Sequence, residues 1–599
     1  MSTQNSIPKR ADVEKRFTWA TEDLFGSDEL WFEELNRCAL MPEKVAAYRG
    51  RLGESAKTLY EYFQLSDEID LKMSALFSYA SRKSDQDTAN GFYQDMRGRI
   101  MSVGVKIDSA SAFEVPELLA ISDETLDKFF AELPELKRYE RYLKKVRRRR
   151  SHILTDAEEA LLASAGEVSS APSDTASIFR NADLKFPDIT VKGKTYKVTQ
   201  GSFVPLLENA DVEVRKAAFL SMYNTFESFK NTCAAFLDSQ VKQLMFHAKA
   251  RKYNNTMEAS LDRTEVPVSV YHNLISAVNA NIGLLHRYIA LRKKLMNVDE
   301  LHMYDIYTSI VPGADEDIDF ETAKTTILEG LKPLGEDYLD MLREGFNNRW
   351  IDVYENEGKR SGAYSAGGRP HPFVLMNYKD TLDSMFTLAH EMGHALHSYL
   401  SVKHQPIVNS QYVIFVAEVA STCNEVLLMH HLLGKTTDKK QRAYLINNFL
   451  EQFRTTLYRQ TMFAEFEMLM NQAAERGESL TADTLSKIYY DLNCKYYGDS
   501  IVVDKEIAYE WARIPHFFYN FYVFQYSTGF SSAVAIANRI LKEGQPAVDD
   551  YIRFLSSGGS QDPISLLKIA GVDMTTAKPV EDALKLFDEL ISEMDELMK

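Results

Sequence analysis

The sequence predicts a mainly α-helical protein that is divided into two or more lobes. At 599 residues, the chain exceeds the size at which a single hydrophobic core stops growing. Apolar residues recur at helical spacing along most of its length, and only two short stretches, near residues 189–199 and 361–378, have the pattern of strands and turns. We expect a helical N-terminal lobe over residues 1–185 and a second, larger domain over residues 186–599.

Charge and composition narrow the class of protein. Hydrophobic residues make up 45% of the chain and charged residues 26%, as in an ordinary globular protein. The net charge of −17 disfavours nucleic acid or an anionic membrane as a partner. It favours ligands that carry positive charge, although acidity that only aids solubility explains it equally well. No run of about twenty apolar residues predicts a transmembrane helix.

The cysteine pattern and the first residues favour a cytoplasmic enzyme. The start of the chain, MSTQNSIPKRADVEKRF, has no apolar segment of the kind found in secretory signals. The cysteines form no CxxC pair and no short-range framework, which is typical of free thiols in a reducing compartment. They are Cys38, Cys233, Cys423 and Cys494.

The first part of the chain, residues 28–150, is predicted to form amphipathic helices separated by short polar breaks. The basic run Lys144–Arg150 closes the last of them, where cations complement the helix dipole. Because the rest of the chain is acidic, we prefer a solvated helix end to a patch that binds polyanions. Thr155 and Glu158 then have the spacing of a capping box, which predicts a new helix.

Two stretches interrupt the helical pattern. The first, ITVKGKTYKV, predicts a hairpin that turns at Lys192–Lys194, and helices resume to about residue 347. The second is the glycine-rich run Ser361–Pro370 followed by HPFVLMNY, His371–Tyr378. The chain after Asp380 is predicted to be helical again. Three glycines in it suit helix C-caps: Gly434, Gly477 and Gly498.

The strongest chemical signal is an HExxH motif at residues 390–394, in a long apolar helix that Asp380 can cap. Residues four apart share a helix face, so His390 and His394 can bind one zinc ion. Glu391, at the adjacent edge, can act as the general base that takes a proton from water. The motif alone is not rare, but two histidines and a glutamate in an apolar helix are costly to desolvate without a shared role. We therefore prefer a metal site to a pair of core histidines.

A catalytic zinc also needs a third protein ligand and an open coordination position. One class of zinc peptidase has a further histidine six residues after the motif, but that position here is Leu400. Glu418 lies in a second apolar helix, with Glu425 two turns further on the same face. We expect Glu418 as the ligand and Glu425 as the acceptor for a ligand imidazole N–H, with the reverse assignment open. Four nearby histidines are interpreted as surface or packing residues: His397, His404, His430 and His431.

Around these motifs the sequence resembles the thimet-oligopeptidase-type zinc peptidases, and within them the oligoendopeptidase F branch. HExxH followed by Glu418 in AEVAST carries the resemblance, together with SGAYSAGGRPHPFVLMNY, IPHFFYNFYVFQYSTGF and TQGSFVPLLENADVEVRKAAF. It covers roughly residues 115–585. It implies a mostly helical, two-lobed shell around a deep substrate channel, one zinc ion per chain on the channel floor, and cleavage of short peptides rather than folded proteins.

His516 and three tyrosines are candidates for completing the chemistry. Zinc-dependent peptide hydrolysis creates an oxyanion that needs a further hydrogen-bond donor. Tyr519, Tyr522 and Tyr526 have the spacing of one helical stripe, which by itself is more typical of an aromatic core. The resemblance implies instead that a histidine and several tyrosines in this segment line the cleft. Which tyrosine meets the oxyanion stays open.

Substrate binding is assigned to the second strand-like stretch. HPFVLMNY can offer a free strand edge to an extended peptide backbone, with the preceding glycine-rich loop as flexible backbone near the substrate. An inert hairpin is the alternative. The candidate substrate-binding residues are Gly362, His371, Pro372, Phe373 and Val374.

The function that these observations predict is a zinc metalloendopeptidase that hydrolyses internal bonds of short, unfolded peptides. The first alternative is a zinc aminopeptidase or carboxypeptidase of the HExxH type, but the sequence offers no recognisable site for a terminal amine or carboxylate. The second is a non-catalytic helical peptide-binding protein.

Overall fold

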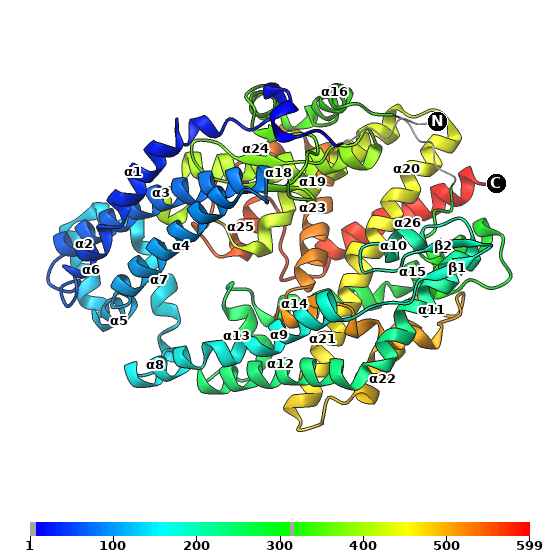
Figure 1. Cartoon of the computed structure of the whole chain (residues 1–599), viewed down its shortest axis with the longest axis horizontal. Helices are drawn as coiled ribbons and strands as arrows, with labels where there is room; N and C mark the ends of the chain where they lie inside the picture. The colour runs from blue at the N-terminus through cyan, green and yellow to red at the C-terminus, as the bar shows by residue number, and fades with distance from the viewer. Residues whose placement is uncertain (1–6, 312–316) are drawn as a thin grey trace. The chain divides into compact units, whose positions relative to one another are not determined.

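Helices form most of the chain, as the sequence predicts, in a computed structural model that describes residues 7–311 and 317–599 (Figure 1). They belong to two compact units, each assembled from three separate stretches of sequence. Unit 1 contains residues 1–151, 315–431 and 536–571, and unit 2 contains residues 152–314, 432–535 and 572–599. The predicted domains, residues 1–185 and 186–599, divide the chain in another way and stay a prediction.

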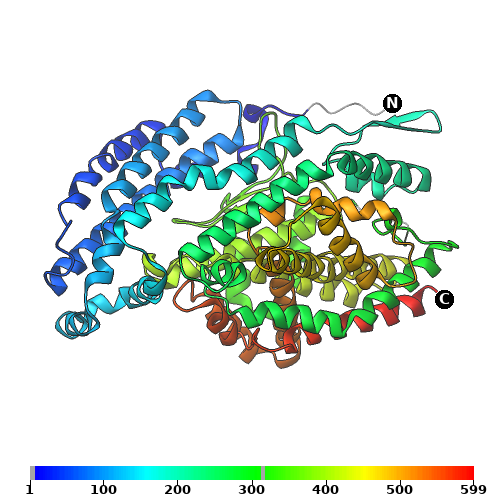
Figure 2. The same cartoon turned by 90° about the horizontal axis from the view of Figure 1, so that it is seen from below.

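Unit 1 begins with the helices predicted for residues 28–150. Its two longest early helices, α3 and α4, lie side by side in both views (Figure 1 and Figure 2). Apolar faces of this group enclose a core around Trp31, Leu59 and Leu76, each fully buried. The helices of unit 1 are α1 Asp28–Cys38, α2 Met41–Ala46, α3 Ala56–Gln86, α4 Gly91–Ser111, α5 Glu114–Ala120, α6 Asp123–Glu132, α7 Glu140–Arg148, α16 Phe320–Gly330, α17 Glu336–Asn347, α18 Leu382–His404, α24 Gln545–Leu555 and α25 Pro563–Ile569, with most of α19, Ile414–Lys435.

Unit 1 also contains a three-stranded sheet in the order β3-β5-β4. Strand β5, Phe373–Leu375, pairs in parallel with β3, Ile351–Asp352, and antiparallel with β4, Tyr364–Ala366. The strand prediction near residues 361–378 is confirmed. The free edge predicted for residues 371–378 is wrong, because β5 is the central strand and both of its edges are already paired.

A segment from the start of the chain packs against this sheet. The indole N–H of Trp19 donates to the carbonyl oxygen of Val374 at 2.7 Å, across 355 residues of sequence. The backbone N–H of Val353 donates to the carbonyl oxygen of Phe17 at 3.0 Å. Arg10 forms an ion pair with the buried carboxylate of Asp352. The sheet is therefore completed by residues more than 300 positions earlier in the sequence.

Unit 2 is helical apart from one hairpin. Strands β1, Ile189–Val191, and β2, Lys194–Tyr196, pair antiparallel, as predicted. Lys192 and Gly193 between them have φ angles of 50° and 79°, the positive values that a two-residue hairpin turn requires. Helices α9 and α12 lie side by side (Figure 1). The helices of this unit are α8 Asp156–Ser164, α9 Gly166–Ile178, α10 Phe203–Leu207, α11 Val212–Ser228, α12 Lys230–Ala250, α13 Thr256–Asp262, α14 Val268–Ala280, α15 Ile282–Met296, α20 Lys439–Gln452, α21 Arg459–Glu475, α22 Ala482–Tyr497 and α26 Lys578–Leu597. Helix α23, Phe524–Glu543, has residues in both units.

Most of the predicted helix ends agree with the structure. The capping box of Thr155 and Glu158 is present, and Gly498 caps α22 with a φ of 69°. Gly477 follows the end of α21 with a φ of 87°. Gly434 is not a cap, because α19 continues through it to Lys435. At the start of α18 the cap is Thr381, whose hydroxyl accepts the N–H of Ser384, rather than Asp380.

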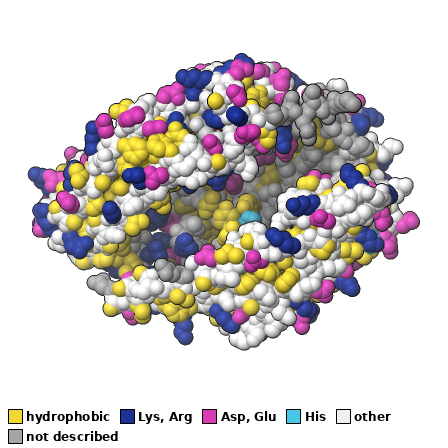
Figure 3. Space-filling view, in the orientation of Figure 1, with side chains coloured by type: hydrophobic (Ala, Val, Ile, Leu, Met, Phe, Trp, Pro, Cys, Tyr) yellow, Lys and Arg dark blue, Asp and Glu magenta, His cyan; other side chains and the backbone are white. Residues whose placement is uncertain are grey.

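The basic run at residues 144–150 closes a helix, as predicted. Its first five residues form the end of α7, where Arg147 donates to the carbonyl oxygen of Leu118 at 3.0 Å and pairs with Asp123. On the face drawn in Figure 3, lysine and arginine side chains are interspersed with aspartate and glutamate. No helix in the described ranges combines the length and the hydropathy needed to cross a membrane. All four cysteines are free.

Candidate active site

Helices α18 and α19 bring the three predicted metal ligands together. His390 and His394 lie one turn apart on α18, and their Nε2 atoms are 3.2 Å from each other. Glu418 projects from α19, with Oε2 at 3.4 Å from Nε2 of His390 and 3.5 Å from Nε2 of His394. One ligand atom from each residue lies within 4.8 Å of the others. We call these three residues the metal group.

The two helices can approach this closely because residue 393 is a glycine. A Cβ atom on Gly393 would lie 2.6 Å from Cα of Ser421, a distance that real Cβ atoms essentially never show. Beside it, the Asn424 side chain donates to the carbonyl oxygen of Ala389 at 3.1 Å and ties α19 to α18. The glycine inside the HExxH motif thus sets the distance at which Glu418 meets the two histidines.

Glu425 orients the first histidine of the group. Its Oε1 lies 2.5 Å from Nδ1 of His390, which leaves Nε2 of that ring facing His394 and Glu418. Burial by itself would lower the pKa of His390, but the hydrogen bonds to Glu418 and Glu425 raise it to about 10. Burial opposes ionisation of Glu418 as well, yet its histidine partners hold the pKa of that carboxyl well below its usual range. The carboxylates of Glu418 and Glu425 therefore stabilise positive charge on the His390 ring and its neighbours.

Glu391 supplies a carboxylate at the edge of the metal group. The residue is 7% exposed, and its Oε2 is buried without a hydrogen-bond partner among the described residues. Burial raises the pKa of Glu391, while the charges of His390 and His394 lower it. Two imidazole nitrogens and one carboxylate oxygen are a ligand set that catalytic zinc sites use, and the free oxygen of Glu391 can accept a proton beside it. The residues present therefore fit a zinc ion.

The other histidines of this region have separate contacts. His397 is buried and stacks on the Tyr412 ring, with centroids 3.7 Å apart and planes 3° from parallel. Nδ1 of His404 lies 2.9 Å from the carbonyl oxygen of Leu400. His431 lies 3.6 Å from Glu329. Each of these three is a packing or surface residue here, in agreement with the prediction.

In unit 2, His516 and the three predicted tyrosines form a second group, which we call the aromatic cluster. The ring centroid of His516 lies 5.5 Å from that of Tyr519, 6.2 Å from that of Tyr522 and 5.8 Å from that of Tyr526. The Tyr526 hydroxyl is 3.3 Å from Nε2 of His516. Burial, and after it the charge of Arg459, lowers the pKa of His516. One imidazole and three phenols thus lie close together in this unit.

The cluster does not lie on one helix, so the predicted helical stripe is wrong. A 3₁₀ turn, Pro515–Phe518, is followed by Asn520 and Phe521 with φ angles of 54° and 59°, and α23 begins only after them. Two remote side chains hold this bend. Glu467 accepts the N–H of Phe521 at 2.6 Å, and Gln240 donates to Oδ1 of Asn520 at 2.9 Å.

Sequence reasoning missed Glu467. The available signal was a charged residue between apolar neighbours in AEFEMLM. Its side chain is 1% exposed, and its second carboxylate oxygen has no hydrogen-bond partner among the described residues.

The candidate substrate-binding residues are mostly buried. His371 stacks on Trp350 with ring centroids 5.3 Å apart. Phe373 and Val374 are 1% and 0% exposed, inside the central strand β5. Gly362 is exposed, with a φ of 83°, and its carbonyl oxygen accepts from the side chain of Asn377. A substrate-binding role for this stretch, Pro372 included, stays a prediction. It is no longer supported by a free strand edge, because β5 is paired on both sides.

Comparison with known proteins gives matches over the whole chain. Residues 205–586 match peptidase family M3, and residues 117–186 match the family described as oligopeptidase F. Oligopeptidase PepF of Bacillus subtilis is 48% identical over 99% of this chain and 89% of its own length. The group B oligopeptidase PepB of Streptococcus agalactiae is 38% identical over 98% of each chain. The crystal structure of oligoendopeptidase-F from Enterococcus faecium, 38% identical, aligns with a TM-score of 0.75 over 95% of this chain and 99% of that one.

Proposed function

The chain belongs to peptidase family M3 and is a metalloendopeptidase; from this premise we propose that its metal is zinc and that its substrates are short oligopeptides in the cytoplasm. The observation that carries the proposal is the metal group of His390, His394 and Glu418 with the unpartnered carboxylate oxygen of Glu391 beside it. The oligopeptidase names of the relatives support the substrate class.

The proposed chemistry divides between the metal and the side chains around it. When bound, zinc supplies a Lewis acid that polarises the peptide carbonyl and lowers the pKa of water. Glu391 takes the proton from the attacking water at its free carboxylate oxygen and later delivers it to the leaving amine. Glu425 keeps Nε2 of His390 turned toward the ligand position by holding Nδ1. Glu391 thus carries the proton in both steps, the attack of water and the departure of the amine.

We assign the oxyanion donor to the aromatic cluster. The support is the resemblance described above and the convergence of one imidazole and three phenols in unit 2. Tyr522 and Tyr526 are the preferred donors. Tyr519 is more exposed, at 54%, and is the weaker candidate. A donor of this kind contributes mainly in the transition state, because the charge that it stabilises forms only there.

The test uses a peptide that is blocked at both ends and has one internal cleavable bond. We expect mass spectrometry to show two internal fragments, loss of cleavage after chelation, and recovery on adding back zinc. The same peptide with free ends is the comparison. An exopeptidase would leave the doubly blocked peptide intact but would shorten the peptide with free ends from one end. A non-catalytic binder would leave both intact, and either result would refute the proposal.

A matched pair of variants on α18 ties the activity to the metal group. His394→Ala removes one proposed ligand. His404→Ala removes a histidine of the same helix whose Nδ1 meets the carbonyl oxygen of Leu400 instead. We expect His394→Ala to lose both zinc and cleavage and His404→Ala to keep both. Equal zinc content in the two variants would contradict the assignment.

A further inference from the structure

A polar cavity in unit 2 lies beside the aromatic cluster. Its volume is about 440 Å³, and Tyr519 forms part of its wall. Hydroxyl and amide groups line it together with two guanidinium groups, an unusual concentration of donors in a chain with a net charge of −17. The lining residues used below are Ser177, Arg180, Asn181, Gln200, Arg513 and Tyr519.

Arg180 is a cation without an acidic partner. It lies in a π-helical turn, Phe179–Asp183, that continues α9. Its guanidinium carbon is 4.9 Å from the centroid of the Phe518 ring, and no carboxylate in the described ranges forms an ion pair with it. Asp174, also in the cavity wall, accepts the hydroxyl of Ser170 at 2.8 Å instead. The Arg180 guanidinium is therefore available to an anion.

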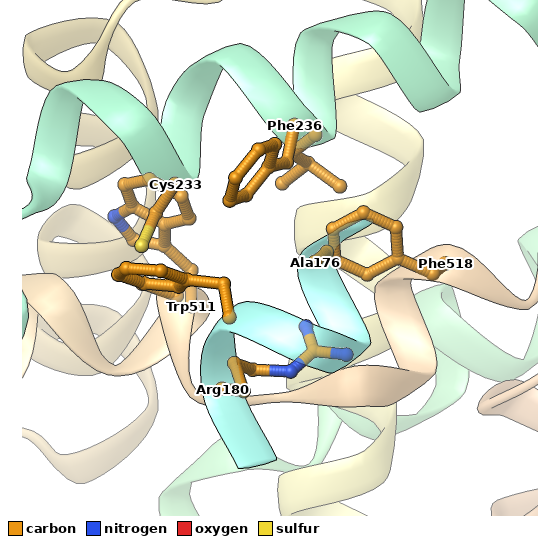
Figure 4. A pocket seen from close by; sticks show the side chains of 9 residues that line it. Ala176, Arg180, Cys233, Phe236, Trp511 and Phe518 are labelled. Carbon is orange, nitrogen blue, oxygen red and sulfur yellow. The ribbon is translucent and has the colours of Figure 1, made fainter. Parts of the chain in front are cut away.

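The surroundings of Arg180 make that anion site stronger than one on an open surface. A second, small and mainly apolar cavity of about 10 Å³ shares Arg180 and Phe518 with the first and is also lined by Cys233 and Trp511. Figure 4 shows the guanidinium turned toward the Phe518 side of this cavity, away from Cys233 and Trp511. Partial removal from water strengthens the attraction between the cation and a bound carboxylate.

Arg513 adds positive charge to the same wall. Its guanidinium lies 3.4 Å from Glu510, but Arg459 approaches the same carboxylate more closely, at 2.6 Å. Two guanidinium groups thus share one glutamate, which leaves an excess of positive charge next to the cavity. The effect reaches the aromatic cluster, since the charge of Arg459 also helps to lower the pKa of His516.

We propose that this cavity binds a carboxylate group of the peptide substrate, with Arg180 as the anchor. The planar guanidinium can hold both carboxylate oxygens, and the side chains of Ser177, Asn181 and Gln200 supply further hydrogen bonds. This rests on the proposed function, because it assumes that peptides reach the aromatic cluster. The carboxylate comes either from the C-terminus of the peptide or from an acidic side chain. The local charge thus selects for a group that the overall acidity of the chain would repel.

The experiment compares peptides that differ only in a carboxylate. A reference peptide with an acetylated N-terminus, a C-terminal amide and one glutamine is compared with its C-terminal free acid and with its Gln-to-Glu analogue. We expect wild type to cut one of the two acidic peptides with a kcat/KM about 10- to 100-fold above the reference, the range for a hydrogen bond to a charged group. The acidic peptide that shows the preference identifies the source of the carboxylate.

The variants test whether Arg180 causes the preference. In Arg180→Gln the ratio of kcat/KM between the acidic and the reference peptide should fall close to one, and Arg180→Lys should restore part of it. Arg476→Gln is the matched control, because it removes one positive charge from an exposed site of the same unit. A ratio that is unchanged in Arg180→Gln, or a wild-type ratio of one for both acidic peptides, would overturn the proposal.

Binding without turnover separates this proposal from the proposed function. The same peptides, labelled with a fluorophore, are titrated with the Glu391→Gln variant and followed by fluorescence anisotropy. Tighter, Arg180-dependent binding of an acidic peptide supports the pocket even if wild type cuts none of the peptides, in which case the proposed function fails alone. If wild type cuts the peptides but all three bind equally well, the carboxylate site is refuted and the proposed function is supported.

Discussion

The metal group and the aromatic cluster are built in different ways. His390, His394 and Glu418 stand on two regular helices whose separation is set by the close contact at Gly393. The aromatic cluster lies on a 3₁₀ turn and two residues with positive φ, and Glu467 and Gln240 hold it from remote parts of the sequence. The first arrangement follows from backbone periodicity, the second from long-range side-chain contacts. They should therefore respond differently to mutation.

The largest effect is expected in the metal group. If the helices fix its geometry, Glu391→Gln should keep close to one equivalent of zinc while kcat falls by about 10²–10⁴, the range for loss of a general base. His390→Ala and Glu418→Ala should lose the metal together with the activity. Elemental analysis and turnover on one peptide decide this. Full zinc occupancy in Glu418→Ala would show that Glu418 is not the third ligand and would favour Glu425 in that role.

The aromatic cluster should show the next largest effect. Loss of one oxyanion donor costs on the order of 10²–10³ in kcat, or roughly 3–4 kcal/mol. We expect Tyr522→Phe or Tyr526→Phe to lower kcat and kcat/KM together with KM nearly unchanged, and Tyr519→Phe to do so less. Steady-state kinetics and melting curves are measured on the three variants. Wild-type kcat in all of them would make the cluster a structural feature only.

The close contact of α18 and α19 predicts a smaller effect on stability. Gly393→Ala should destabilise the protein by about 1–3 kcal/mol, because its methyl group meets backbone that has no room to move aside. Gly98→Ala is the control, since a Cβ atom there meets nothing within 4 Å inside α4 and should add up to about 1 kcal/mol of helix stability. Thermal melting compares the two. A neutral Gly393→Ala would mean that the helices are not held at this distance.

A further effect on stability concerns pH and the bend of the aromatic cluster. Burial raises the pKa of Glu467 to about 8, although the N–H of Phe521 opposes the shift. Below the ordinary glutamate pKa, both folded and unfolded chains carry the proton. Between pH 4.5 and about 8 the unfolded chain releases it first, so rising pH removes up to about 1.4 kcal/mol of stability per pH unit.

The variant Glu467→Gln tests this dependence, because an amide keeps an acceptor for Phe521 but does not titrate. The difference in melting temperature between variant and wild type should therefore grow in favour of the variant from pH 5 to pH 8. Other carboxyl groups titrate equally in both proteins and cancel in the difference. Parallel melting profiles would show that Glu467 is already ionised in the folded protein.

The comparison also explains what could be predicted from the sequence. The spacing of His390 and His394 on a regular helix gives their side chains a common direction, and Glu418 and Glu425 share a face of α19 for the same reason. The path of residues 515–526 could not be predicted, because its positive φ angles depend on a hydrogen bond from Phe521 to Glu467, which is 54 residues away. The pairing of β5 was also missed, since β3 joins it from a stretch with no strand signal of its own.

The contact between Trp19 and Val374 has a consequence for folding on the ribosome. The two residues are 355 positions apart, so at about 5–20 residues per second Trp19 is made roughly 20–70 s before its partner. During that interval the sheet against which Phe17 and Trp19 pack has not yet been made, and their aromatic side chains face solvent. The nascent chain therefore exposes an apolar segment around Phe17 and Trp19 to chaperones until β5 emerges.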